Sequence, residues 1–151
     1  MADSLKTRVG RVITGSVHAL VDHLENQAPV AVMEQSLREA EAVIGDVRHE
    51  LGLASANRHL AQQQHANLNG QHGKLGEQIE QALNAGREDL ARAAVARQLD
   101  IEAQIPVLET TLAELARQER GLTRYVTAVL ATQRAMSAAL EAFRRSRASA
   151  T

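Results

Sequence analysis

The stretch EQIEQALNAGREDL, Glu77–Leu90, decides the fold because it ends one long helical pattern and begins another. Asn84 and Gly86 suit a helix C-terminus, since both residue types tolerate the left-handed conformation that is common there. Glu88 and Asp89 then place carboxylates at the positive end of the next helix dipole. The stretch therefore predicts the tip of a long antiparallel helical hairpin.

Both arms of this hairpin carry apolar residues in the alternating three-and-four spacing of a coiled coil. The stripe of the first arm consists of Met33, Leu37, Ala40, Ile44, Val47, Leu51, Ala54, Ala61, Leu68, Leu75, Ile79 and Ala82. The stripe of the second arm consists of Leu90, Ala94, Ile101, Ile105, Leu108, Leu112, Leu115, Leu122, Val126, Val129, Met136, Leu140 and Phe143. Polar Arg58, His65 and His72 fall on the first seam, and Pro106 predicts a bend in the second helix.

The first arm contains a glycine-rich section, with Gly70, Gly73 and Gly76. Each glycine costs up to about 1 kcal/mol relative to alanine in a helix, which indicates a locally weak or bent helix. The alternative is that these glycines allow another backbone to approach closely. The section lacks the spacing of a phosphate-binding loop.

Upstream of the hairpin, the apolar spacing predicts a short amphipathic helix with basic residues beside its apolar face. Such a helix can lie in a membrane interface, or its stripe can pack on the protein's own helices or on a neighbouring subunit. The candidate membrane-binding residues are Leu5, Lys6, Arg8, Val9, Arg11, Val12, Ile13, Val17 and Leu20. A break at Asn26–Pro29 separates this helix from the hairpin, because proline suits only the first turn of a helix.

The expected fold is therefore all-α, with an N-terminal amphipathic helix followed by a long antiparallel coiled-coil helical hairpin. The predicted segments are the helix at 1–25, the hairpin at 29–145 with arms at about 29–84 and 87–145, the tip at 84–88, and a frayed tail at 146–151. Two helices share only one seam, whereas a domain normally closes its core with a further layer. We therefore expect lateral association into a homo-oligomer or polymer.

Composition restricts the possible function mainly by excluding several classes of protein. The chain has 151 residues, no cysteine and no Trp, with one Tyr and one Phe, so disulfides are excluded and extended helix packing is favoured over an aromatic-lined pocket. The formal net charge of −1 and the lack of a continuous basic face give no support for nucleic-acid binding. No apolar run approaches the roughly 20 residues that span a bilayer, and the expected location is the cytoplasm.

The titratable residues do not form a pattern of catalysis or metal binding. None of the six histidines has the i, i+4 spacing that places two imidazoles on one metal ion. Carboxylates alternate with Arg and Gln as they do on solvated helix faces. We therefore expect no enzyme activity, no cofactor and no metal.

The segment EQIEQALNAGREDLARAAVARQ, Glu77–Gln98, resembles the hairpin tip of the phage shock protein A family, most specifically in REDLARAA. That family includes the thylakoid vesicle-inducing protein and belongs to the ESCRT-III-like membrane remodellers. The N-terminal helix, the break at Pro29 and MEQSLREAEAVIGDVR, Met33–Arg48, are also similar to the family's plan.

The resemblance implies a peripheral protein on the inner face of the cytoplasmic membrane that polymerises and acts under envelope stress. The first helix is then expected to bind anionic lipids, and the hairpin to bind an AAA+ transcription activator in some members. Tip residues expected to take part in assembly are Arg87, Glu88, Asp89, Leu90 and Arg92. A proline at position 90 is expected to disrupt the hairpin and the assembly that depends on it.

Overall fold

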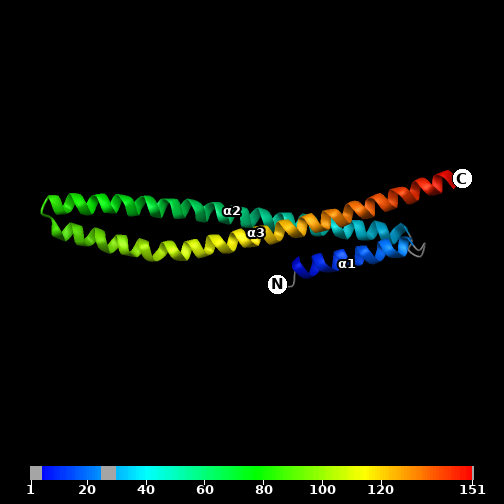
Figure 1. Ribbon diagram of the computed structural model, residues 1–151, viewed down its shortest axis with the longest axis horizontal. Helices are drawn as coiled ribbons and strands as arrows, with labels where there is room; N and C mark the ends of the chain where they lie inside the picture. The colour runs from blue at the N-terminus through cyan, green and yellow to red at the C-terminus, as the bar shows by residue number, and fades with distance from the viewer. Residues whose placement is uncertain (1–4, 25–29, 151) are drawn as a thin grey trace. The chain divides into compact units, whose positions relative to one another are not determined.

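The structure, a computed structural model, describes residues 5–24 and 30–150, which form three α-helices (Figure 1). Helix α1 spans Leu5–Leu24, α2 spans Val30–Asn84 and α3 spans Glu88–Ala150. The all-α fold class, with one short helix followed by two long ones, is confirmed. The predicted break at Asn26–Pro29 lies outside the described residues. Helix α3 continues to Ala150, so the part of the expected tail at 146–150 is helical and not frayed.

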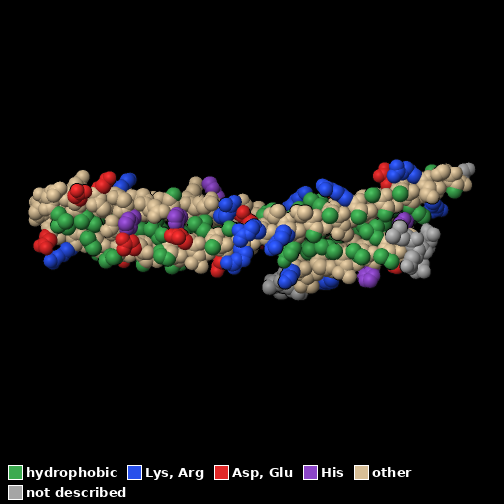
Figure 2. All heavy atoms as spheres, in the orientation of Figure 1, with side chains coloured by type: hydrophobic (Ala, Val, Ile, Leu, Met, Phe, Trp, Pro, Cys, Tyr) green, Lys and Arg blue, Asp and Glu red, His purple; other side chains and the backbone are tan. Residues whose placement is uncertain are grey.

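The chain forms two compact units, and both α2 and α3 contribute to each of them. Unit 1 comprises Met1–Gly52 and Arg120–Thr151, and it contains α1, the first part of α2 and the last part of α3. Unit 2 comprises Leu53–Glu119 and contains the rest of the two long helices with the turn between them. Hydrophobic side chains gather where the helices of each unit meet (Figure 2).

The core of unit 1 lies where α1 meets the two long helices. Met33 and Met136 are fully buried and form one cluster with Ala19 of α1 and Leu140 of α3. Val47 and Val129 are also fully buried. Arg144 pairs with Glu34 at 2.7 Å at the surface of the same unit. Most of these residues lie on the predicted seams, and Ala19 adds α1 to the packing.

Unit 2 has a thinner core of mostly small side chains. Ala54, Ala61 and Ala91 are buried, and Ile101 is the largest side chain there that is fully buried. Two helices with alanine at their contact can approach closely but bury little apolar area per residue. The stability of unit 2 is therefore expected to depend strongly on its few large buried side chains.

Polar seam residues of α2 are matched by glutamates of α3 in unit 2. The pairs are Arg58 Nε with Glu119 Oε1 at 2.8 Å, His65 Nε2 with Glu109 Oε1 at 3.5 Å, and His72 Nε2 with Glu102 Oε1 at 2.8 Å. Residue numbers rise on α3 as they fall on α2, which is the order of antiparallel helices. A carboxylate thus lies opposite each of the three polar seam residues, and Arg58 and His72 hydrogen-bond to theirs, whereas His65 Nε2 is buried without a hydrogen bond.

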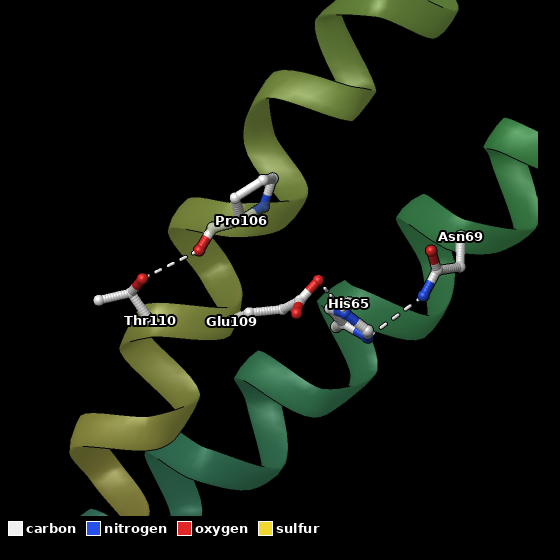
Figure 3. A network of polar contacts seen from close by, with 5 residues as sticks. All are labelled: His65, Asn69, Pro106, Glu109 and Thr110. Atoms are coloured by element: carbon white, nitrogen blue, oxygen red, sulfur yellow. Dashed lines mark hydrogen bonds and ion pairs between the residues drawn. The ribbon is translucent and has the colours of Figure 1, made fainter.

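Figure 3 shows one of these pairs beside the proline of α3. Pro106 lacks the amide that bonds to the preceding turn, yet α3 continues through it without a break. Thr110 Oγ1 donates to the carbonyl oxygen of Pro106 at 3.1 Å, and on α2 Asn69 Nδ2 lies 3.3 Å from His65 Nδ1. The sequence-based expectation of one helix through Pro106, and not two, is confirmed.

The turn between α2 and α3 has the hydrogen bonds of a Schellman motif. Gly86 has φ +74°, the left-handed conformation that glycine adopts without a side-chain clash. The amide of Gly86 donates to Leu83 O at 3.1 Å, and the amide of Arg87 donates to Ala82 O at 2.8 Å. The predicted helix stop at Gly86 is thus observed, and α3 begins with Glu88 and Asp89 in its first turn.

The glycine-rich section of α2 is helical throughout, and a Cβ at Gly70 or Gly73 meets no other atom of the chain within 4 Å. Close approach by another part of this chain therefore does not explain those two glycines. We expect Gly73→Ala to raise the free energy of unfolding by about 0.5–1 kcal/mol, because alanine loses less backbone entropy on folding. Gly86→Ala is the matched control and is expected to lower it by about 1–2 kcal/mol, because its φ is positive. Chemical denaturation followed by circular dichroism measures both, and a loss of stability in Gly73→Ala contradicts the expectation.

Candidate functional site

Helix α1 carries apolar side chains around more than half of its circumference, and the protein covers only one edge of them. The buried edge follows Val9, Ser16, Ala19 and His23, whose spacing of three, four and seven places them on one side of the helix. Leu5, Arg8, Val12, Ile13 and Leu20 are half-buried. The expectation that the stripe packs on the protein's own helices is therefore met for this edge.

Small side chains explain why this edge faces the long helices. Ser16 and Ala19 lie at its centre, and Ala19 belongs to the buried cluster with Met33, Met136 and Leu140. The imidazole of His23 meets the ring of Phe143 edge-on, with centroids 4.9 Å apart. Ser16 Oγ is buried and has no hydrogen-bond partner. A buried hydroxyl without a partner opposes folding, so the contact of α1 includes an unfavourable polar group.

The opposite edge of the apolar face is exposed. Val17 and Val21 are 50% and 46% exposed, and Lys6 lies on the same side of α1. Positions 6, 17 and 21 differ by eleven and four, which are close to whole turns of an α-helix. The exposed edge therefore combines branched apolar side chains with an ammonium group.

The basic residues of α1 differ in their surroundings. Arg8 Nη2 donates to Asp46 Oδ2 of α2 at 2.5 Å, and both side chains remain about half exposed. Lys6 and Arg11 are exposed. Arg8, Arg11, Val12, Glu39, Ala42 and Val43 line a groove of about 320 Å³ where α1 meets α2. Of the candidate cations for a lipid surface, Arg8 is therefore already engaged by a carboxylate of the same chain.

The predicted tip residues are all exposed: Arg87, Glu88, Asp89, Leu90 and Arg92. Arg87 donates from Nε and Nη2 to the Asp89 carboxylate, both at 3.3 Å, and Arg92 pairs with Glu88 at 3.5 Å. The Arg87 hydrogen bond, followed by one from the Leu90 amide, lowers the pKa of Asp89. A carboxyl whose pKa is lowered on folding adds stability above its unfolded pKa, and this is lost as the pH falls through its folded pKa.

The structure corrects the placement of Leu90 on the seam and bears on the expected effect of a proline there. The seam of α3 begins at Ala91, which is buried, whereas Leu90 is exposed, because α3 starts only two residues before it. The first backbone bond of α3 joins the Ala91 amide to Arg87 O at 3.1 Å, so position 90 lies in the first turn. A proline at position 90 removes no bond of the α3 backbone ladder but disfavours the helical conformation of Asp89, so we expect Leu90→Pro to destabilise the hairpin less than a proline further along α3.

A groove and several exposed apolar side chains lie on unit 2. A groove of about 490 Å³ near the tip is lined by residues of both long helices, including Leu75, Leu90 and Arg97. Further along, Leu60 of α2 and Leu99 and Val107 of α3 are more than half exposed. Val95, Leu99 and Val107 lie on α3 outside the seam. Contiguous exposed apolar surface is typical of interaction sites.

Among residues 5–24 and 30–150, the structure contains no helix with the length and hydropathy needed to cross a bilayer. Nor does the described part of the chain bring three or more His, Cys, Asp or Glu side chains together in a way that could hold a metal ion.

Sequence reasoning missed the residues through which α1 contacts the rest of unit 1. Asp46, Ser16 and His23 were not singled out, since none of them is apolar. The signal available was the small-residue spacing of Ser16 and Ala19, which marks the side of α1 that can approach other helices most closely. The carboxylate that opposes Arg8 has no signal in the sequence, because it lies 38 residues away on another helix.

Comparison with known proteins agrees with the architecture. Residues 4–149 match the family model described as the PspA/IM30 family. The phage shock protein A homolog of Deinococcus radiodurans is 25% identical over 126 residues, which cover 79% of this chain and 56% of that protein. The chain thus spans little more than half the length of this relative. Because the family match extends over nearly all of its residues, the chain belongs to the PspA/IM30 family.

Proposed function

We propose that this chain is a self-assembling scaffold of the phage shock protein A type that binds the inner face of the cytoplasmic membrane through α1. In this role it stabilises or remodels the membrane under envelope stress. Membership of the PspA/IM30 family supports the proposal, and α1 supplies a surface of suitable chemistry. The residues proposed to contact lipid are Leu5, Lys6, Arg8, Val9, Arg11, Val12, Ile13, Val17 and Leu20.

The observation that carries the membrane half of the proposal is the exposed edge of α1. Val17 and Val21 are about half exposed on the same side of α1 as Lys6. An interfacial helix binds by burying apolar side chains at the headgroup boundary while its cations meet anionic lipid. Each Lys or Arg near an anionic surface contributes about 1 kcal/mol, which falls with rising salt. The cations and the exposed valines of α1 therefore both favour reversible binding to an anionic surface.

Co-sedimentation with vesicles tests this half of the proposal. We expect the full chain to sediment with vesicles of equal parts phosphatidylglycerol and phosphatidylcholine at low salt. The bound fraction is expected to fall at high salt and with vesicles of phosphatidylcholine alone, because the cations lose their attraction. A chain that stays in the supernatant at low salt contradicts the membrane role.

The assembly half of the proposal rests on unit 2. Leu60, Leu99 and Val107 expose apolar side chains on unit 2, where the described residues form two helices that share one seam. The tip adds exposed Leu83 and Leu90 beside a groove, with Arg87, Glu88, Asp89 and Arg92 around them. These surfaces support lateral contacts between copies of the chain, with the tip residues as proposed contacts.

The same apolar side chains favour a second function, that of a coiled-coil adaptor that binds and regulates a partner such as an AAA+ transcription activator. These side chains belong to unit 2, whereas the proposed lipid-binding residues belong to unit 1. Capture of such an activator by the full chain without vesicles favours the adaptor. Loss of that capture in Leu99→Asp with Val107→Asp assigns it to this face.

A further inference from the structure

We infer that α1 is held in a closed position by its own unit 1, and that binding to a lipid surface requires the helix to leave it. This inference rests on the proposed membrane function and adds a regulatory contact to it. It starts from an overlap of surfaces. Val9, Val12 and Leu20 are needed by a lipid-facing helix, yet they are wholly or partly covered by the protein.

The overlap makes the two positions of α1 mutually exclusive for its central residues. Ala19 lies in the buried cluster with Met33, Met136 and Leu140, and Leu20 packs against that cluster. A bilayer cannot reach these side chains while α2 and α3 cover them. The exposed edge with Val17 and Val21 can touch lipid in the closed position, but it offers only part of the apolar face.

Charge reinforces the closed position. Asp46 of α2 pairs with Arg8, which is also one of the proposed lipid-binding cations. While this pair is intact, Arg8 interacts with a carboxylate and not with a lipid phosphate. Asp46 belongs to α2 and lies outside the proposed lipid-binding residues, so it opposes binding without taking part in it.

Two features of the contact between α1 and the long helices favour its opening. The Arg8–Asp46 pair is about half exposed, so an anionic surface can compete with Asp46 for Arg8. Ser16 Oγ is buried without a partner, and opening of the contact returns it to water or headgroups. A lipid surface therefore binds the open form more tightly than the closed form. The larger the fraction of closed protein, the lower the apparent affinity of the whole chain for lipid.

Asp46→Ala tests the inference, with Glu41→Ala as the matched control. Glu41 is an exposed carboxylate on the same helix, and its loss changes the net charge by the same amount. We expect Asp46→Ala to lower the lipid concentration for half-maximal sedimentation about two- to fivefold, the range of one exposed ion pair. Glu41→Ala is expected to change it much less. Equal effects of the two variants overturn the inference, since charge alone then explains them.

Leu140→Ala provides a second test that changes no charge. It removes a buried side chain from the cluster around Ala19 and leaves the sequence of α1 unchanged. It is therefore also expected to strengthen binding to the same vesicles. Hydrogen exchange without lipid reports the contact itself. The amides of α1 are expected to exchange faster in both variants than in the unaltered chain, while those of unit 2 are unchanged.

The outcomes separate this inference from the proposed function. Faster exchange in α1 without stronger vesicle binding overturns the closed position as a control on binding, while the membrane role stands. Unchanged exchange of α1 in both variants overturns it as well, because the contact then does not depend on these residues. Failure of the unaltered chain and of both variants to bind at low salt overturns the membrane role and the inference together.

Discussion

Val12→Glu is expected to reduce binding to phosphatidylglycerol-containing vesicles at low salt by at least about tenfold. In the closed position Val12 lies in a groove lined by Glu39 and also by Arg8 and Arg11, so a carboxylate at position 12 meets charges of both signs there. On the proposed lipid-facing side the same carboxylate is unfavourable, because burial of a charge costs roughly 2–3 kcal/mol and anionic lipid repels it. Binding is therefore expected to fall.

His18→Glu is the control for this prediction. His18 is exposed on the side of α1 opposite to the buried edge, so the added charge stays in water. We expect only a small, salt-dependent loss of binding from it. Equal losses in the two variants, or normal binding by Val12→Glu, contradict the assignment of this face to lipid. Co-sedimentation at two salt concentrations distinguishes these results.

Ile101→Ala is expected to lower the free energy of unfolding by about 2–4 kcal/mol. Ile101 is fully buried, and most of the other buried residues of unit 2 are alanines. Few neighbours are large enough to fill the space that Ile101 leaves, so the loss includes a cavity term as well as lost burial. Denaturation by urea, followed by circular dichroism, measures the change.

Leu99→Ala is the matched control, two residues away on the same helix. Its side chain is 57% exposed, so its removal is expected to change the free energy of unfolding by less than about 0.5 kcal/mol. A similar loss of stability in both variants contradicts the seam as described. If Leu99→Ala loses stability and Ile101→Ala does not, the core lies on the face of α3 that carries Leu99.

The sequence was sufficient for the hairpin because its signals are local. Gly86 marks the helix stop, Glu88 and Asp89 mark the next start, and heptad spacing identifies the seam. The polar seam residue Arg58 was also found, but its pairing with Glu119 emerged only from the structure. Pairing across helices depends on their register, and spacing along one helix does not specify it.

The placement of α1 could not be predicted in the same way. Its apolar residues cover so much of the helix that periodicity leaves open which edge is buried. The structure buries the edge with Ser16 and Ala19 and exposes Val17 and Val21, because small side chains allow closer packing on the long helices. Leu90 was misplaced for a related reason. In the first turn of α3 the apolar spacing has not yet completed one repeat, so it does not decide between Leu90 and Ala91 as the first seam residue.

Electron microscopy of negatively stained protein, with and without phosphatidylglycerol-containing vesicles, tests the proposed membrane scaffold most directly. We expect assemblies larger than small oligomers, and vesicles whose surface is coated or reshaped by the protein. Bare vesicles beside dispersed small particles at low salt contradict the account.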